Sequence, residues 1–283
     1  MNRNIWRNLY FVVFLFFVAE VQAEVKPVVT GWHKVLVNGQ HSGYLLQDYS
    51  VNTKTKQFVA TNFTRIVLPG RDISRSLKAF ADDKFHPISY QYIEQTNTSV
   101  RTINATFDKN VMTATVVNDG KALEPQQLKL PENTIQAIFL YLLMVTRKEG
   151  VKVGDHFAYN AMAEDTGAFH VGTADIVEMA KVEGLDAFKI VNSFNDAKTI
   201  EHITPTGQIV QTKDMESGVE TRLVATQDEA TGAFPVPRDA LKTLFGRVPT
   251  ASFPRPGEKD NVEPVTNDLP KGLSVPPGKT KTK

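Results

Sequence analysis

The chain has 283 residues, with 32 Lys and Arg against 31 Asp and Glu, and it contains no cysteine. The lack of cysteine excludes disulfide bonds, thiolate metal sites, cysteine nucleophiles and a lipid-anchoring cysteine. A hydrophobic fraction of 41% is enough for a sizeable core, and the length allows one large all-β domain or two small ones.

The N-terminus has the three-part pattern of a secretory signal peptide. Two arginines precede an unbroken apolar segment of eleven residues, Leu9 to Ala19, and residues 21–23 place small side chains where a signal peptidase reads them. We expect residues 1–23 to be removed by cleavage between Ala23 and Glu24, although an uncleaved anchor is the alternative. The pattern predicts an exported protein, periplasmic or otherwise secreted.

The charge balance of the mature chain argues against nucleic acid. Removing residues 1–23 leaves 30 basic and 30 acidic residues, so the formal charge is zero. Nucleic-acid-binding proteins normally carry a basic excess on one face. We therefore expect no nucleic-acid partner. We also expect no transmembrane span in the mature chain, because its apolar run from Ile135 to Val145 is far shorter than the roughly 20 residues that a span needs.

The first half of the mature chain predicts a series of antiparallel strands. Segments of β-branched and aromatic residues alternate with Gly, Asn and Asp turns about every 8 to 12 residues. The expected strands are 32–37, 43–50, 57–68, 73–81, 88–95, 99–107 and 111–117. Asn38-Gly39 is the strongest hairpin signal among them, because both residues tolerate positive φ.

The most hydrophobic stretch of the mature chain predicts a buried helix near residues 133–149. Only one plainly polar side chain interrupts Ile135 to Val145, and a helix that is apolar nearly all round is buried. Asn133 or Thr134 can cap its start, and Gly150 can end it in the left-handed conformation.

After this helix the strand pattern resumes. The expected strands are 155–163, 169–181, 187–194, 198–203, 208–215 and 219–225, and residues 238–245 can form a short helix. Residues 247–283 are rich in proline and mixed charge, which predicts a disordered tail. The tail could tether or dock an envelope partner, but a passive tail is the simpler interpretation.

Two runs of strands on either side of one helix predict a mainly β fold. We expect residues 24–246 to form a single domain, a long curved antiparallel sheet or half-open barrel wrapped around the buried helix. The pattern leaves open whether the two halves form one continuous sheet or two small domains.

No residue pattern demands a reaction. The histidines form no HExxH pair or short-spaced metal cluster, and the chain has no Gly-x-Ser-x-Gly elbow, phosphate loop or GxGxxG motif. We expect no catalytic residue, no metal and no cofactor. An unrecognised hydrolase is an alternative, and it would require at least two of His156, His170, Glu164 and Asp165 to converge in a cleft. The three Asn-x-Ser/Thr sites begin at Asn62, Asn97 and Asn104, and they matter only in a eukaryotic source.

Several aromatic residues could line a hydrophobic groove between sheet and helix. They are Trp32, Tyr44, Tyr90, Tyr92, Phe139 and Tyr141. Ligand pockets are mostly apolar with a few polar groups, so a lipid or acyl chain is the expected ligand of such a groove. The simpler interpretation is that these rings form the core.

The segment Trp32 to Tyr44, of the form W-x-x-V-x-V-N-G-x-x-x-G-Y, resembles the opening of exported bacterial β-rich domains of unknown function. Some members stand alone in the periplasm, and others precede a transglutaminase-like domain. The stretches from Pro131, at 153–155 and at 224–230 fit the same group, so the resemblance covers roughly residues 31–231. It implies an extended antiparallel sheet curled around a helix, similar in outline to periplasmic lipoprotein carriers, and it implies no catalytic residues.

The leading hypothesis is therefore a non-enzymatic periplasmic protein that serves the cell envelope as a binding or accessory module. Its candidate partners are a lipid or acyl chain in the concavity of the sheet, or an envelope protein. The first alternative is a structural or interaction protein that docks a partner through a sheet edge or the tail. The second is the hydrolase described above. The ligand-binding residues stay unassigned.

Overall fold

The computed structural model describes residues 25–253. The predicted signal peptide with its cleavage site, and the predicted tail from residue 254 onward, lie outside the described residues.

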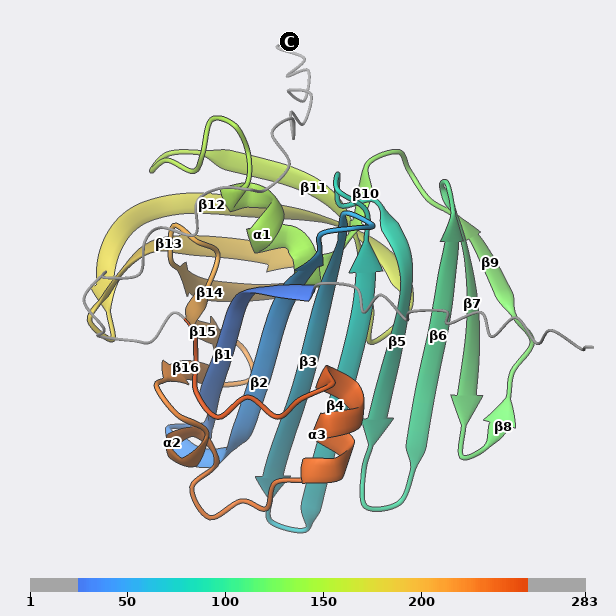
Figure 1. The fold of residues 1–283 in the computed structure, drawn as a ribbon, viewed down its shortest axis with the longest axis horizontal. Helices are drawn as coiled ribbons and strands as arrows, with labels where there is room; N and C mark the ends of the chain where they lie inside the picture. Colours follow the sequence, from blue (N-terminus) through green and yellow to red (C-terminus); the bar gives the residue numbers. More distant parts are fainter. Residues whose placement is uncertain (1–24, 254–283) are drawn as a thin grey trace, which may run out of the picture.

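Sixteen strands in one open sheet dominate the described residues (Figure 1). The first half of the chain contributes β1 (Val25–Val37), β2 (Gln40–Asn52), β3 (Gln57–Leu68), β4 (Arg71–Ala81), β5 (Pro87–Gln95), β6 (Val100–Asp108), β7 (Val111–Asn118), β8 (Lys121–Ala122) and β9 (Gln126–Lys129). The second half contributes β10 (Thr134–Gln136), β11 (His156–Ala163), β12 (Ala168–Val182), β13 (Leu185–Phe194), β14 (Ala197–Ile203), β15 (Ile209–Asp214) and β16 (Val219–Val224). The helices are the 3₁₀ turn η1 (Ala137–Phe139), α1 (Leu140–Val145), α2 (Gln227–Thr231) and α3 (Arg238–Phe245).

The strand order joins both halves of the chain into one continuous sheet. It runs from β10 through β16, then from β1 through β8, with β9 paired to β7. All pairs are antiparallel except β10 with β11. The joint is the pairing of β1 with β16, in which Trp32 lies opposite Val224 and Val37 opposite Val219. The prediction of a mainly β, mostly antiparallel sheet is confirmed, and the sheet is open rather than closed into a barrel.

The turn chemistry of the sequence places the first hairpin correctly. Asn38 and Gly39 connect β1 to β2 with φ of 51° and 80°. This is the left-handed conformation that the Asn-Gly pair tolerates and that matches the twist of a two-residue hairpin.

The two faces of the sheet have different partners. The inner face packs against η1 and α1, and its cluster combines Tyr49 of β2, Ile103 of β6 and Ile190 of β13 with Phe139 and Leu142. Small side chains leave room for this segment on the inner face: Ala60, Ala79, Ala105, Ala114, Ala161 and Ala174. The outer face carries a second cluster, described below.

Aromatic rings fill the space around Phe139. Its ring centroid lies 6.0 Å from that of Phe85 and 6.4 Å from that of Tyr49, and Phe85 stacks on Phe58 at 4.5 Å. Phe139 is 0% exposed. The segment between the two runs of strands is therefore the centre of the main core.

The predicted helix over 133–149 is wrong in its extent. Asn133 has a φ of 59°, so it cannot act as the expected cap, and Thr134–Gln136 form strand β10 parallel to β11. The first turn begins at Ala137, and the carboxylate of Glu164 accepts a hydrogen bond from the Ile138 N–H at 3.1 Å. A run that is apolar on all sides suits a buried strand as well as a buried helix, so periodicity could not separate the two.

The second cluster covers the outer face of β1, β2 and β3. Trp32, Tyr44 and Phe63 pack there against Leu241 of α3 and Ala230 of α2, and Figure 1 shows α3 lying across β3 and β4. None of the described helices is long and apolar enough to cross a membrane.

Residues 248–253, the closing segment, also pack on the outer-face cluster around Trp32. The Trp32 Nε1–H donates to the Pro249 carbonyl at 3.0 Å, and the backbones of Thr30 and Phe253 exchange two hydrogen bonds of 2.9 and 2.7 Å. The predicted start of a disordered tail at residue 247 is thus too early, because Pro249 and Phe253 are hydrogen-bonded to β1.

Candidate functional site

The six aromatic residues singled out in the sequence do not line one groove. Trp32 and Tyr44 lie on the outer face, whereas Tyr90, Tyr92, Phe139 and Tyr141 lie in the inner cluster. Each of them is at most 7% exposed. They form the core on both sides of the sheet, as the simpler interpretation predicted.

The residues that a hydrolase would need are separated by the sheet. His156 pairs with Asp175 and His170 pairs with Ala161, and an odd spacing along β11 puts these two pairs on opposite faces. The His156 Nδ1 lies 2.6 Å from an Asp175 carboxylate oxygen on the exposed side of this strand pair. Glu164 is buried against the start of η1, and its neighbour Asp165 is exposed.

His33 is a buried histidine with a structural role. His33 is 1% exposed on the inner face, its Nε2 lies 2.9 Å from the Ile209 carbonyl oxygen, and burial lowers its pKa to about 4. Within residues 25–253, no three His, Asp or Glu side chains come together in a way that could hold a metal ion.

Within residues 25–253, at least two surface hollows have room for a small molecule. The first, the end groove, has a volume of about 620 Å³ and lies between the β4–β5 turn, the β6–β7 turn and the segment that leads into β10. It is lined by Asp82, His86, Pro87, Ile88, Lys109, Asn110, Leu130, Pro131, Glu132, Asn133 and Thr134. Most of its charged groups are exposed, and Asp82 pairs with His86 at 2.9 Å within the β4–β5 turn.

The second hollow, the outer groove, has a volume of about 480 Å³ and lies between α3 and the outer face of β3, β4 and β5. It is lined by Phe63, Arg65, Asp72, Ser74, Gln95, Thr96, Asn97, Pro237 and Ala240. Strand register explains why its polar residues meet: Arg65 lies opposite Ser74, and Ser74 lies opposite Gln95. Directly paired residues share a face, so the three form one row across three strands.

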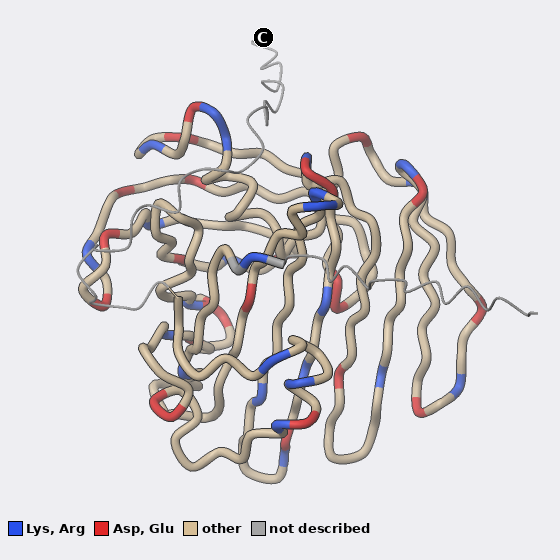
Figure 2. Tube along the Cα trace, in the orientation of Figure 1, with Lys and Arg blue, Asp and Glu red and all other residues tan. Residues whose placement is uncertain are grey.

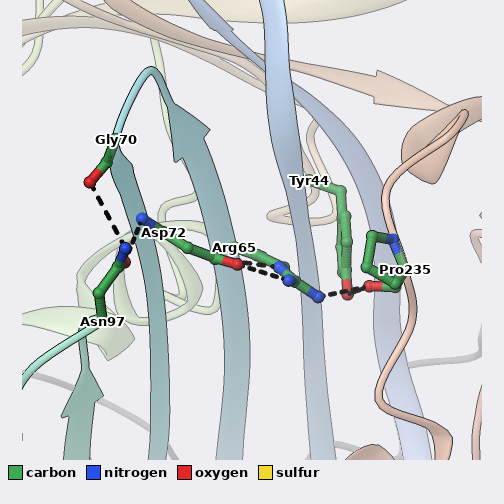
Figure 3. A network of polar contacts seen from close by, with 6 residues as sticks. All are labelled: Tyr44, Arg65, Gly70, Asp72, Asn97 and Pro235. Carbon is green, nitrogen blue, oxygen red and sulfur yellow. Dashed lines mark hydrogen bonds and ion pairs between the residues drawn. The ribbon is translucent and has the colours of Figure 1, made fainter.

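A fork of charge-assisted hydrogen bonds fixes Arg65 in this row (Figure 3). Its Nε and Nη2 donate to the two carboxylate oxygens of Asp72 at 3.1 and 2.6 Å, and its Nη1 donates to the Pro235 carbonyl at 2.8 Å. The hydrogen bonds to Asp72 raise the pKa of Arg65 above its ordinary value. This two-point geometry holds both side chains in a single orientation.

Further bonds extend the frame to neighbouring elements. The Asn97 Oδ1 accepts from the backbone N–H of Asp72 at 2.7 Å, which ties the β5–β6 turn to β4. The Tyr44 hydroxyl donates to the Pro235 carbonyl at 3.1 Å, and burial raises the pKa of Tyr44 to about 12. Tyr44 therefore stays a donor at neutral pH and anchors the segment before α3.

Beside this frame the groove presents unused hydrogen-bonding groups. Among the described residues, neither the Ser74 hydroxyl nor the Gln95 amide has a side-chain hydrogen bond to protein, and Gln95 is exposed. Phe63 forms part of the wall, with its ring 6.0 Å from that of Tyr44, and Pro237, just before α3, also lines the groove. The outer groove thus combines a rigid polar frame, free polar groups and an apolar patch.

Sequence reasoning singled out almost none of these residues. Tyr44 is one of the aromatic residues that the sequence suggests for a groove, and Asn97 starts an Asn-x-Ser/Thr site, whereas no motif marks Arg65, Ser74 or Gln95. Side chains alternate between the two faces along each predicted strand, so the sequence indicates which neighbours share a face with Arg65, with Ser74 and with Gln95. The register of three hairpins and the docking of α3 are tertiary features, and the sequence pattern did not contain them.

Comparison with known proteins adds little. No family model and no curated protein matches this chain. Among solved structures, the crystal structure of a DUF1089 family protein from Pseudomonas aeruginosa is similar, with 13% sequence identity and a TM-score of 0.36. The match covers 60% of this chain and 88% of that one. A similarity at this level carries no conclusion about function.

Proposed function

We propose that this protein is a non-enzymatic binding protein whose ligand occupies the outer groove. The supporting observation is the Arg65–Asp72 fork, fixed at 2.6 Å and tied to Asn97, beside the unused groups of Ser74 and Gln95. Side chains that the protein already holds in place lose little conformational freedom when a ligand arrives, which favours binding.

The inner face is a poorer place for a ligand. The leading sequence hypothesis puts a lipid or acyl chain between sheet and helix, and that space is occupied by the rings around Phe139. An apolar ligand there would have to displace a fully buried phenylalanine. A polar ligand in the outer groove meets no such obstacle.

The end groove is the larger of the two hollows, but its fixed carboxylate is held within a single turn: Asp82 accepts hydrogen bonds from the N–H groups of Lys84 and His86 at 2.8 Å and pairs with the His86 ring. Lys109 and Glu132 in its lining are exposed, and within residues 25–253 neither makes an ion pair or a side-chain hydrogen bond. Flexible exposed side chains must be ordered before they can hold a ligand, which weakens binding.

Binding without reaction is the simplest chemistry for the outer groove. Ser74 is the one serine in its lining, and no histidine or lysine among the lining residues could activate that hydroxyl. From the export pattern at the N-terminus we expect this activity in the periplasm or outside the cell.

A crystallographic fragment screen of the purified protein tests this proposal. We expect polar fragments to gather in the outer groove and to be excluded by Ala240→Phe, which would place a ring in it. Lys242→Phe is the matched control on α3, because Lys242 is exposed and does not line the groove. Fragments that gather in the end groove instead, or that still bind the outer groove of Ala240→Phe, would contradict the proposal.

A further inference from the structure

The charge of the outer groove limits the ligands that it can accept. Its lining contains one cation, Arg65, and one anion, Asp72, in direct contact at 2.6 Å. An anionic ligand would meet the Asp72 carboxylate, and a cationic ligand would meet the guanidinium. Bringing an unpaired charge against a like charge is unfavourable, so the lining favours a ligand without net charge. Figure 2 shows that Lys, Arg, Asp and Glu are interspersed along the rest of the described residues as well.

The hydrogen-bonding groups of the groove call for a ligand that both donates and accepts. The Ser74 hydroxyl and the Gln95 amide each offer a donor and an acceptor. Asp72 accepts one bond from Arg65 at each oxygen and keeps further lone pairs, with 40% of its side chain exposed. A hydroxyl group of the ligand matches these side chains because its oxygen can both donate and accept a hydrogen bond. An apolar ligand would instead desolvate these groups without replacing their bonds to water.

One part of the wall is apolar. Phe63 of β3 is only 7% exposed and shows the groove one edge of its ring, and Pro237, just before α3, adds carbon surface beside the polar row. A sugar ring presents hydroxyls around its edge and aliphatic C–H groups on its faces, so a single ring can meet both kinds of wall. The volume of about 480 Å³ lies within the range of about 300–1,000 Å³ that is usual for small-molecule sites.

From these three features we infer that the outer groove binds a neutral saccharide, whose hydroxyls bond to Ser74, Gln95 and the Arg65–Asp72 fork while a ring face lies near Phe63. The inference rests on the proposed function for its site and adds the class of ligand. It concerns an uncharged carbohydrate, free or as part of a larger glycan.

A glycan microarray probed with the purified protein tests the ligand class. We expect binding to uncharged glycans, and about tenfold weaker binding by Gln95→Leu, because the variant loses both hydrogen bonds of the amide. Ser74→Ala should weaken binding in the same direction. The matched control is Gln91→Leu: Gln91 is also exposed on β5 but bonds to Asn104 outside the groove. Equal unfolding temperatures of the variants and wild type show that losses are local.

Two results would overturn the inference. The first is an array on which no uncharged glycan binds, or on which binding follows sulfate or carboxylate groups. The second is unchanged glycan binding by both Gln95→Leu and Ser74→Ala. If polar fragments still occupy the outer groove in the crystallographic screen, the site survives and the ligand class alone fails.

Discussion

A single buried carboxylate, that of Glu164, binds the backbone at the start of the segment η1–α1 (residues 137–145). It accepts a hydrogen bond from the Ile138 N–H at 3.1 Å and is 7% exposed. Burial raises its pKa to about 7, from an ordinary value of 4.5. Between these two values the folded protein holds a proton that the unfolded chain has released. The contribution of Glu164 to the free energy of unfolding therefore falls as the pH rises from about 4.5 to 7.

Glu164→Gln removes this titration and keeps an oxygen acceptor for Ile138. We predict that the variant gains stability relative to wild type as the pH rises, by up to about 3 kcal/mol between pH 4 and pH 8, from a pKa difference of roughly 2.5 units. The measurement is urea unfolding of both proteins at several pH values. His33 has a lowered pKa and acts in the opposite direction, but it is present in both proteins and cancels in the difference. A stability difference independent of pH would refute this assignment of Glu164.

At the scale of elements, the short segment η1–α1 has a larger role than its length suggests. Its side chains touch strands from both halves of the sheet, and Phe139 is fully buried among rings from β2 and β3 and from the β4–β5 turn. Removing a buried aromatic ring loses its transfer free energy and leaves a cavity that packed neighbours cannot fill.

Phe139→Ala should therefore lower the free energy of unfolding by about 3–5 kcal/mol. Leu143→Ala, at a half-buried position of the same segment, should cost clearly less. Chemical denaturation followed by circular dichroism measures both. Equal losses in the two variants would show that the segment does not lie at the centre of the core.

The elements show which parts of the fold were predictable. The Asn38-Gly39 hairpin was predictable because turn chemistry is local to two residues. Strand β10 was not, because Thr134–Gln136 belong to an apolar run whose conformation is decided by its partner β11. The outer groove was harder still, since Arg65 and Gln95 meet through the register of separate hairpins and under a helix from the far end of the sequence.

At the scale of the whole molecule, the two ends of the described chain are joined. Ser252 lies between β1 and β16: its hydroxyl accepts from the Trp32 N–H at 2.8 Å and donates to the Val224 carbonyl at 2.6 Å. The same segment covers the ring of Trp32 through Pro249. The closing segment thus helps to hold together the joint between the two halves of the sheet.

Ser252→Ala would leave a buried donor and a buried acceptor without partners, and each such group costs about 1–3 kcal/mol. We predict a lower unfolding temperature for this variant. Ser217→Ala, in the exposed β15–β16 turn, should have an effect close to zero. Indistinguishable unfolding temperatures for these two variants would mean that the closing segment contributes little to the fold.

The central claim is that a neutral saccharide binds in the outer groove, and protein-detected NMR titration with uncharged disaccharides tests it most directly. We predict saturable shifts of the side-chain amides of Gln95 and Asn97 and of the backbone amides around Ser74, with little change at the end groove near Asn133. Shifts that gather at the end groove or around the inner core, or no saturable shift with any uncharged sugar, would contradict it.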